Sequence, residues 1–281
     1  VTSASNSVTL AAYTDSGCSS AAGGSLSAAT NPLAASSGVA SFSSVSYNQA
    51  ATIYLRASAA GLTADCSSSV AIGPAAAAAL GFSVQPSATG TAGASLGTAP
   101  SVEVLDGLSN RVTSATNSIT LAAFTDSGCT SAASGTFSAA SNPLSASSGV
   151  AAFSNVSYTK AESIYIKATA AGLTSVCSNA VAISAASASA LAFSTQPSST
   201  GTAGAALSTQ PVIQVRDAYA NLVGGASNSV TLAAFTDSGC TAAGAGTFSA
   251  TTNPLAASSG VATFGGVSYT KAESIYVKAT A

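Results

Sequence analysis

The chain has 281 residues, of which only 6% are charged, and a formal net charge of −2. Soluble domains usually carry about 25% charged residues. Seven Lys and Arg residues without a basic cluster argue against a nucleic-acid partner. Histidine is absent, which excludes His-based catalytic triads and His metal sites. No apolar run approaches the ~18 residues of a membrane span, and the Ser-, Thr-, Ala- and Gly-rich composition is typical of secreted or surface-displayed proteins.

A long internal repeat organises the whole sequence. VTSASNSVTLAAYTDSGC at 1–18 returns as VTSATNSITLAAFTDSGC at 112–129 and as VGGASNSVTLAAFTDSGC at 223–240, so each copy begins 111 residues after the one before. A period of this length fits a domain rather than a solenoid coil. We expect three units: a first repeat at 1–78 without its N-terminal strands, a complete second repeat at 79–189, and a third repeat at 190–281 without its last strand.

The second repeat contains seven segments that alternate between apolar and polar residues, as strands do. Turn-forming sequences such as Asp-Gly, Asn-Pro and Ser-Ser-Gly separate them. Seven short strands in one repeat predict an all-β fold in which each domain is a two-layer antiparallel sandwich. The expected strands, in chain order, are 79–85, 101–106, 117–125, 134–139, 149–159, 162–170 and 176–184.

The repeat resembles the bacterial immunoglobulin-like repeats of invasin- and intimin-type surface proteins. The resemblance is carried by LAFSTQPSSTGTAG at 191–204, VIQVRDAYANLV at 212–223 and SGVATFGGVSYTKAESIYVKATA at 259–281, which stand in the family's order and cover essentially the whole chain. It implies tandem immunoglobulin-like domains arranged as beads on an extracellular rod, with no catalytic site. The cysteine pattern departs from many such repeats, so the resemblance implies no disulfide.

The five cysteines occupy repeated positions. Cys18 and Cys66 are 48 residues apart, and so are Cys129 and Cys177. Because secreted proteins are commonly oxidised, we expect one disulfide within each of the first two repeats. A pair of buried thiols is the alternative. Cys240 has no partner at this spacing, since its counterpart would fall at position 288. We therefore expect the natural polypeptide to continue in both directions.

Two acidic residues recur with an asparagine four positions later: Asp106 with Asn110, and Asp217 with Asn221. Asp side chains accept hydrogen bonds from nearby backbone N–H groups, so we expect both pairs to form turns. Calcium sites need several oxygen ligands, usually with clustered carboxylates. Each Asp here is nearly isolated and the linkers between repeats contain no acid, so we predict no metal and no cofactor.

Catalytic motifs are missing as well. The sequence contains no Gly-x-Ser-x-Gly elbow before a helix and no Ser-x-x-Lys, and GTAGAS and GTAGAA lack the Lys-Ser/Thr of a phosphate-binding loop. Lys160 and Glu162 lie two residues apart in an expected strand and would face solvent together. Tyr54, Tyr165 and Tyr276 recur once per repeat on an outward face. They are candidate interface residues, with cross-strand packing as the alternative.

These observations favour a non-enzymatic segment of a long extracellular stalk or filament, semi-rigid because its linkers contain Ala rather than Gly. Its expected partners are further repeats of the same polypeptide and like chains in a bundle. The alternative is an adhesin module whose domains bind a receptor or glycan. The three repeats differ mainly by exchanges among Ala, Ser and Thr, which favours a spacer. A third hypothesis, an accessory domain of a secreted polysaccharide enzyme, requires a catalytic domain outside this sequence.

Overall fold

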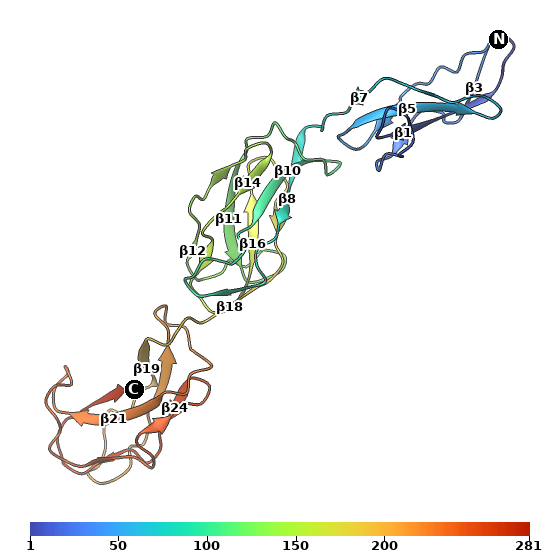
Figure 1. The fold of residues 1–281 in the computed structure, drawn as a ribbon. Helices are drawn as coiled ribbons and strands as arrows, with labels where there is room; N and C mark the ends of the chain where they lie inside the picture. The colour runs from blue at the N-terminus through green and yellow to red at the C-terminus, as the bar shows by residue number, and fades with distance from the viewer.

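The computed structural model describes residues 1–281 and is an all-β protein without helices. The predicted fold class is confirmed. The strands fall into three groups that follow one another along an extended molecule, with the N-terminus at the free end of the first group (Figure 1). Hydrogen-bonded strand pairs form only within a group. No helix is present that could cross a bilayer.

The second repeat has the most complete sandwich. One sheet has the strand order β14-β10-β8, and the other has the order β13-β11-β16-β18-β9, with β17 also paired to β16. Its strands are β8 (Ala77–Val84), β9 (Thr89–Thr91), β10 (Ser101–Asp106), β11 (Ser118–Phe124), β12 (Phe137–Ser138), β13 (Leu144–Ser145), β14 (Val150–Ala152), β15 (Ser157–Tyr158), β16 (Ser163–Thr169), β17 (Val176–Cys177) and β18 (Val181–Ser184).

The first and third repeats contain parts of the same sandwich. The first repeat comprises β1 (Ser7–Tyr13), β2 (Leu26–Ser27), β3 (Leu33–Ala34), β4 (Ser46–Tyr47), β5 (Thr52–Ala59), β6 (Asp65–Cys66) and β7 (Val70–Ala71). The third comprises β19 (Ala190–Thr195), β20 (Val212–Arg216), β21 (Ser229–Phe235), β22 (Phe248–Ser249), β23 (Leu255–Ala256), β24 (Val261–Thr263), β25 (Ser268–Tyr269) and β26 (Tyr276–Thr280).

Alternation along the strands builds the core of the second repeat. Val102 and Val104 on β10, and Ile164, Ile166 and Ala168 on β16, are all fully buried. Successive side chains of a strand point to opposite faces, so these residues meet between the two sheets. Burying a Val or Ile side chain stabilises a fold by roughly 1.5–3 kcal/mol. The core of the second repeat comprises 20 buried residues, against eight in the third repeat.

Two of the expected strands are each divided into two. The segment 149–159 forms β14 and β15, which pair in different sheets, and Asn155 between them has a positive φ of 51°. That left-handed backbone cannot continue a strand. The segment 176–184 forms β17 and β18, both paired with β16. Strands β9 and β13 were not expected, because two or three residues are too few to show an alternation.

The repeated Asn-Pro-Leu motif closes the edge of a sheet. In the second repeat Asn142 Oδ1 accepts from the backbone N–H of Leu121, and its Nδ2 donates to the carbonyl of Leu121, both at 2.8 Å. The side-chain amide thus replaces a neighbouring strand at that position. Asn31 with Leu10, and Asn253 with Leu232, repeat the contact.

The TDSGC segment forms a turn that carries a cysteine into the domain. Asp126 accepts from the backbone N–H groups of Thr130 and Ser131, and Cys129 within the turn has a φ of 50°. Cys129 is bonded to Cys177 with a Cα–Cα distance of 6.2 Å. Cys18 is bonded to Cys66 in the same way, and Cys240 is a free thiol. These disulfides are the two pairs that the 48-residue spacing singles out.

Replacing Cys129 and Cys177 together by Ser should destabilise the second repeat. Closing a loop of this length reduces the entropy of the unfolded chain and stabilises the fold by about 4 kcal/mol. Hydrogen exchange of the β11 and β16 amides should accelerate in the double variant, and Cys240→Ser should leave it unchanged. Equal exchange in all three proteins would contradict this prediction.

Candidate functional site: the junctions between repeats

Two turns at the N-terminal ends of the second and third repeats connect each repeat to the preceding one. We call residues 106–110 and 217–221 the Asp–Asn turns. Within the first, Asp106 Oδ1 accepts from the backbone N–H of Leu108 and of Asn110, both at 2.8 Å. The second turn repeats these bonds from Asp217 at 2.9 Å. The two turns therefore have the internal hydrogen bonds expected from the sequence.

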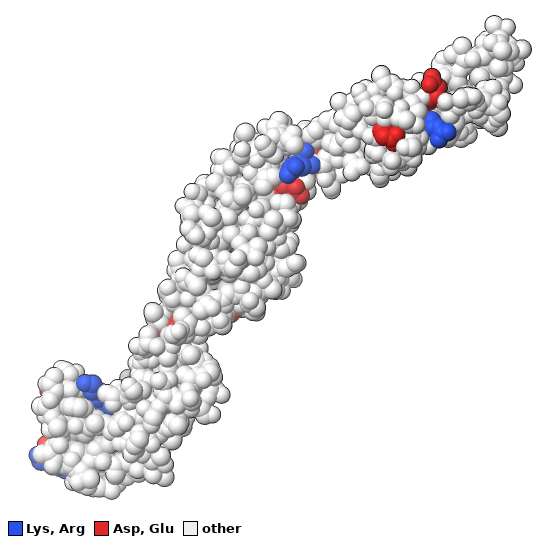
Figure 2. All heavy atoms as spheres, in the orientation of Figure 1, with Lys and Arg blue, Asp and Glu red and all other residues white.

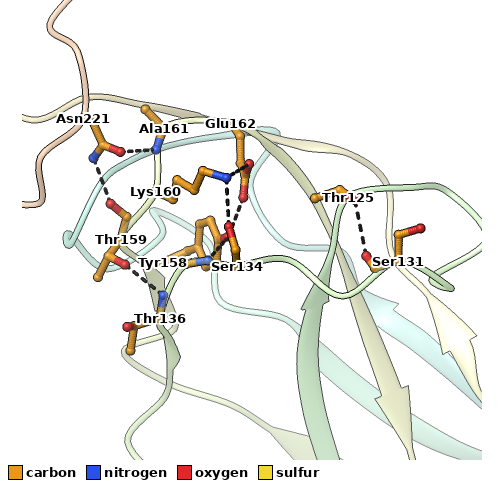
Figure 3. A network of polar contacts seen from close by, with 11 residues as sticks. Thr125, Ser131, Ser134, Thr136, Tyr158, Thr159, Lys160, Ala161, Glu162 and Asn221 are labelled. Carbon is orange, nitrogen blue, oxygen red and sulfur yellow. Dashed lines mark hydrogen bonds and ion pairs between the residues drawn. The ribbon is translucent and has the colours of Figure 1, made fainter. Parts of the chain in front are cut away.

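The asparagine of each turn also bonds the preceding repeat. Asn110 Oδ1 accepts from the backbone N–H of Ala50 at 2.9 Å, and its Nδ2 donates to the carbonyl of Asn48 at 3.1 Å. At the second junction Asn221 makes the same two bonds to Ala161 and Thr159, both at 2.9 Å. In Figure 3 Asn221 lies against the 159–161 loop of the second repeat. Each asparagine thus binds the backbone of one loop of its neighbour.

The aspartate of each turn holds the linker. Asp106 Oδ2 accepts from the backbone N–H of Ala75, which lies between β7 and β8, at 2.8 Å. Asp217 Oδ2 accepts from Ala186 in the next linker, also at 2.8 Å. The same oxygen of each aspartate accepts from the side-chain amide of its asparagine. Asparagine and aspartate therefore form one network that joins the turn, the linker and the neighbouring repeat.

Both aspartates are ionised over the whole neutral range. Burial raises the pKa of Asp106, but hydrogen bonds from Asn110, Ala75 and Leu108 outweigh it and lower the pKa to about 2. Asp217 has the same surroundings, and its pKa is lowered against the effect of burial by bonds from Asn221, Ala186 and Tyr219. Only 3% of Asp106 and 2% of Asp217 is exposed. A buried carboxylate is stable here because N–H groups surround it.

The loop that receives Asn221 is braced from within its own repeat. Tyr158 Oη accepts from the backbone N–H of Gly135 at 2.7 Å and donates to Glu162. Burial, followed by the bond to Glu162, raises the pKa of Tyr158 to about 12. Glu162 forms an ion pair with Lys160 at 2.8 Å, and Lys160 also donates to Ser134 (Figure 3). Lys160 and Glu162 lie on one side of the loop, as expected, and form part of this brace.

The second junction has one contact that the first lacks. The ring of Tyr219 in the second Asp–Asn turn lies over Gly93 of the second repeat, where an added Cβ would come within 1.9 Å of Tyr219 Oη. Gly93 also has a φ of 75°, which favours glycine. Leu108 occupies the position of Tyr219 in the first turn and is 58% exposed. Sequence reasoning did not identify Tyr219 or Gly93, because their contact joins residues that are more than one repeat apart.

The candidate interface tyrosines lie beside other aromatic residues rather than in a common patch. Tyr54, Tyr165 and Tyr276 stand opposite Tyr13, Phe124 and Phe235 in neighbouring strands. Tyr276 is 46% exposed and the other two are half-buried. Cross-strand aromatic packing accounts for this position in every repeat. A role of these tyrosines in an interface stays a prediction.

The surface around the junctions carries little charge. The visible face of the molecule in Figure 2 shows only a few isolated Lys, Arg, Asp and Glu side chains. No group of three or more His, Cys, Asp and Glu residues is arranged to hold a metal ion. Asp106 and Asp217 instead use both carboxylate oxygens for protein N–H groups.

Comparison with known proteins gives only distant matches. No family model and no curated protein matches the sequence. The structure of InvD from Yersinia pseudotuberculosis aligns over 97% of this chain and 80% of its own, with 14% identity and a TM-score of 0.37. Extracellular domains 3–5 of Drosophila OTK align over 98% and 84%, with 12% identity and a TM-score of 0.23. Values this low do not assign a function to this chain.

The linker amide of Ala75 should report the titration of Asp106. The lowered pKa means that the carboxylate stabilises the junction above about pH 4, the usual range of Asp, and that this contribution is lost as the pH falls towards 2. In an NMR titration the Ala75 amide shift should change with a midpoint near pH 2. A midpoint near the ordinary Asp pKa of about 3.9 would contradict the network.

Asn221→Ala should loosen the second junction without unfolding either repeat. The substitution leaves the N–H of Ala161 and the carbonyl of Thr159 without their partner. Leaving such groups unpaired costs roughly 1–3 kcal/mol, so hydrogen exchange at Ala161 should accelerate about 5- to 150-fold.

Asn228→Ala is the matched control for this variant. Asn228 lies exposed in the same repeat, and only its backbone carbonyl is bonded, to Ala257. Exchange at Ala161 should be unchanged in the control, and amides of β11 should be unaffected in both variants. Equal acceleration at Ala161 in the two proteins would show that Asn221 has no specific role.

Proposed function

We propose that this chain is a non-enzymatic structural segment of a long extracellular stalk or filament, in which the repeats act as spacers of fixed mutual orientation. The single observation that carries the proposal is the equivalence of the two junctions. Every partner in the hydrogen-bond network at the first junction has its counterpart 111 residues later at the second. Equal contacts impose equal geometry, so length increases by the same step with each repeat.

The junction chemistry favours a semi-rigid rod over a flexible string. A linker without bonds samples many conformations, and ordering each residue costs about 1–2 kcal/mol. Here the linker N–H groups of Ala75 and Ala186 are bonded to buried carboxylates, and the asparagines bond the next loop. These contacts offset the entropy of the linker at both junctions.

The cysteines support an oxidising location outside the cell. Disulfides persist in secreted and surface proteins and are rare in the cytosol. The bonds Cys18–Cys66 and Cys129–Cys177 lie at equivalent positions of successive repeats. Each also strengthens a domain whose strands contain many Ala residues, which contribute little apolar burial.

The residues with the most chemical potential support a structural role. The buried carboxylates hold the junctions, and Asp15, Asp126 and Asp237 bond the N–H groups of their own turns. Each carboxylate therefore already has a structural function. Partners proposed for this segment are further repeats of the same kind and like chains in a bundle.

Electron microscopy of single molecules can test the spacer function through the angle between neighbouring repeats. In the wild-type protein the angles should cluster narrowly around the same value at both junctions. The double variant Asn110→Ala/Asn221→Ala should widen both distributions, because each junction loses its two asparagine bonds.

Asn117→Ala/Asn228→Ala provides the matched control, since these asparagines are also 111 residues apart and make no side-chain hydrogen bond. It should retain the wild-type distributions. Broad, unequal angles in the wild-type protein would argue against a rod. Specific binding of a receptor or glycan by isolated molecules would favour the adhesin alternative.

A further inference from the structure

The third repeat has an open groove along one edge of its sandwich. The groove has a volume of about 600 Å³ and lies between the segments 197–203 and 269–277. We call it the strand groove. Leu207, Ile275 and Val277 contribute apolar side chains to its walls. It therefore offers apolar surface between two extended segments of backbone.

In the second repeat a strand occupies the same place. Strand β18 lies between β16, to which it is antiparallel, and β9, to which it is parallel. Its Val181 is fully buried and its Ile183 is 5% exposed. The backbone N–H of Ala182 donates to Ala88, and that of Ile183 donates to Glu162. Strand β18 thus joins two segments that otherwise do not pair.

Both walls of the strand groove keep the backbone groups that β18 uses. The counterparts of Ala88 and Glu162 are Ser199 and Glu273, whose carbonyl groups accept no hydrogen bond in the structure. Ala203 corresponds to Ala92, which donates to Ser184 of β18, but its own N–H is without an acceptor. Unpaired backbone groups beside an apolar groove are a site for strand addition.

The walls are also less ordered into strands than in the second repeat. No strand corresponds to β9, and β26 begins at Tyr276, whereas β16 begins at Ser163, the counterpart of Ser274. Ile275 and Leu207 are half-buried, while their counterparts Ile164 and Leu96 are buried. A strand in the groove would restore both pairings.

The shape of the groove fits the side chains of β18. In the second repeat a Cβ on Gly90 would come within 2.9 Å of Ile183, so the isoleucine packs directly on the glycine. Gly201 stands at the same position of the third repeat, and only Leu207 lies near it. A space for an isoleucine side chain is therefore present above Gly201.

A free thiol lies at the corresponding end of this system. Cys240 is the counterpart of Cys129, which in the second repeat is bonded to Cys177, four residues before Val181. A strand that enters the groove in the register of β18 would bring a cysteine at the Cys177 position to Cys240.

We propose that the strand groove binds an extended peptide segment with the Cys-x-x-x-Val-x-Ile pattern of residues 177–183, aligned parallel to 200–202 and antiparallel to 274–275. The occupant is a last strand of this repeat type, and its cysteine pairs with Cys240. The site adds a binding activity to the spacer role. Its test measures peptide binding rather than the angle between repeats, so the two proposals can fail separately.

The experiment uses the full 281-residue protein and a synthetic peptide, TSVCSNAVAIS, with the sequence of residues 174–184. Fluorescence anisotropy with a labelled peptide should show saturable binding of one peptide per chain, because β18 fills the equivalent site of the second repeat. In NMR spectra the amides of 200–203 and 274–277 should shift, and exchange at Ala203 should slow.

Matched variants test the register. A peptide with Asp in place of both Val181 and Ile183 should bind at least about 100-fold more weakly, since both side chains lose their apolar burial. Gly201→Val in the protein should weaken binding of the unaltered peptide by filling the space for isoleucine. The circular dichroism of this variant should remain that of the wild type.

A covalent measurement tests the cysteine position. The peptide is supplied as a mixed disulfide with glutathione, so that the Cys240 thiolate attacks the peptide sulfur, forms the protein–peptide disulfide and releases one glutathione thiol. The wild-type protein should release one thiol per chain. Cys240→Ser should release none and still bind the peptide.

Three results would overturn the proposal. The first is no saturable binding of the unaltered peptide up to about 1 mM, which corresponds to very weak association. The second is equal affinity for the Asp-substituted peptide. The third is a dimer of the protein that the peptide does not dissociate, because a second copy would then cover the groove.

Discussion

The structure depends on one constraint, the satisfaction of backbone hydrogen-bonding groups where one repeat meets the next. Ala75 and Ala186 have no polar side chain, so their linkers contribute only backbone N–H and carbonyl groups. The Asp–Asn turns provide partners for these groups and for the receiving loop at the same time. A side-chain amide is well suited to this task because it offers an acceptor and two donors within one planar group.

Stability within a repeat and order between repeats have different physical origins. The sandwich is held by apolar burial between its sheets and by the Cys129–Cys177 bond, which restricts the unfolded chain. The junction is held by hydrogen bonds to buried carboxylates, whose energy depends on pH and on the exclusion of water. Strong acid or a substitution in an Asp–Asn turn can therefore free the repeats from one another while each stays folded.

Much of the fold was predictable because its signals are local or periodic. Val102 and Val104 alternate with polar residues, and the 111-residue register locates equivalent strands in each repeat. Asp106 and Asn110 could be predicted as a turn from their spacing. Their contacts with Ala50 and Asn48 could not, since these span about sixty residues and depend on how two folded domains meet. The break at Asn155 was missed because its left-handed backbone leaves no mark in the apolar pattern.

Equivalent junctions have a consequence for the geometry of a longer array. Each junction is a head-to-tail contact, and repeating such a contact generates a screw axis rather than a closed ring. The pitch of that screw is then encoded in the five residues of an Asp–Asn turn and not in the sandwich itself. Exchanging Leu108 for Tyr219 between successive turns alters one step of the screw, so local differences among turns would bend the axis at chosen places while the domains stay alike.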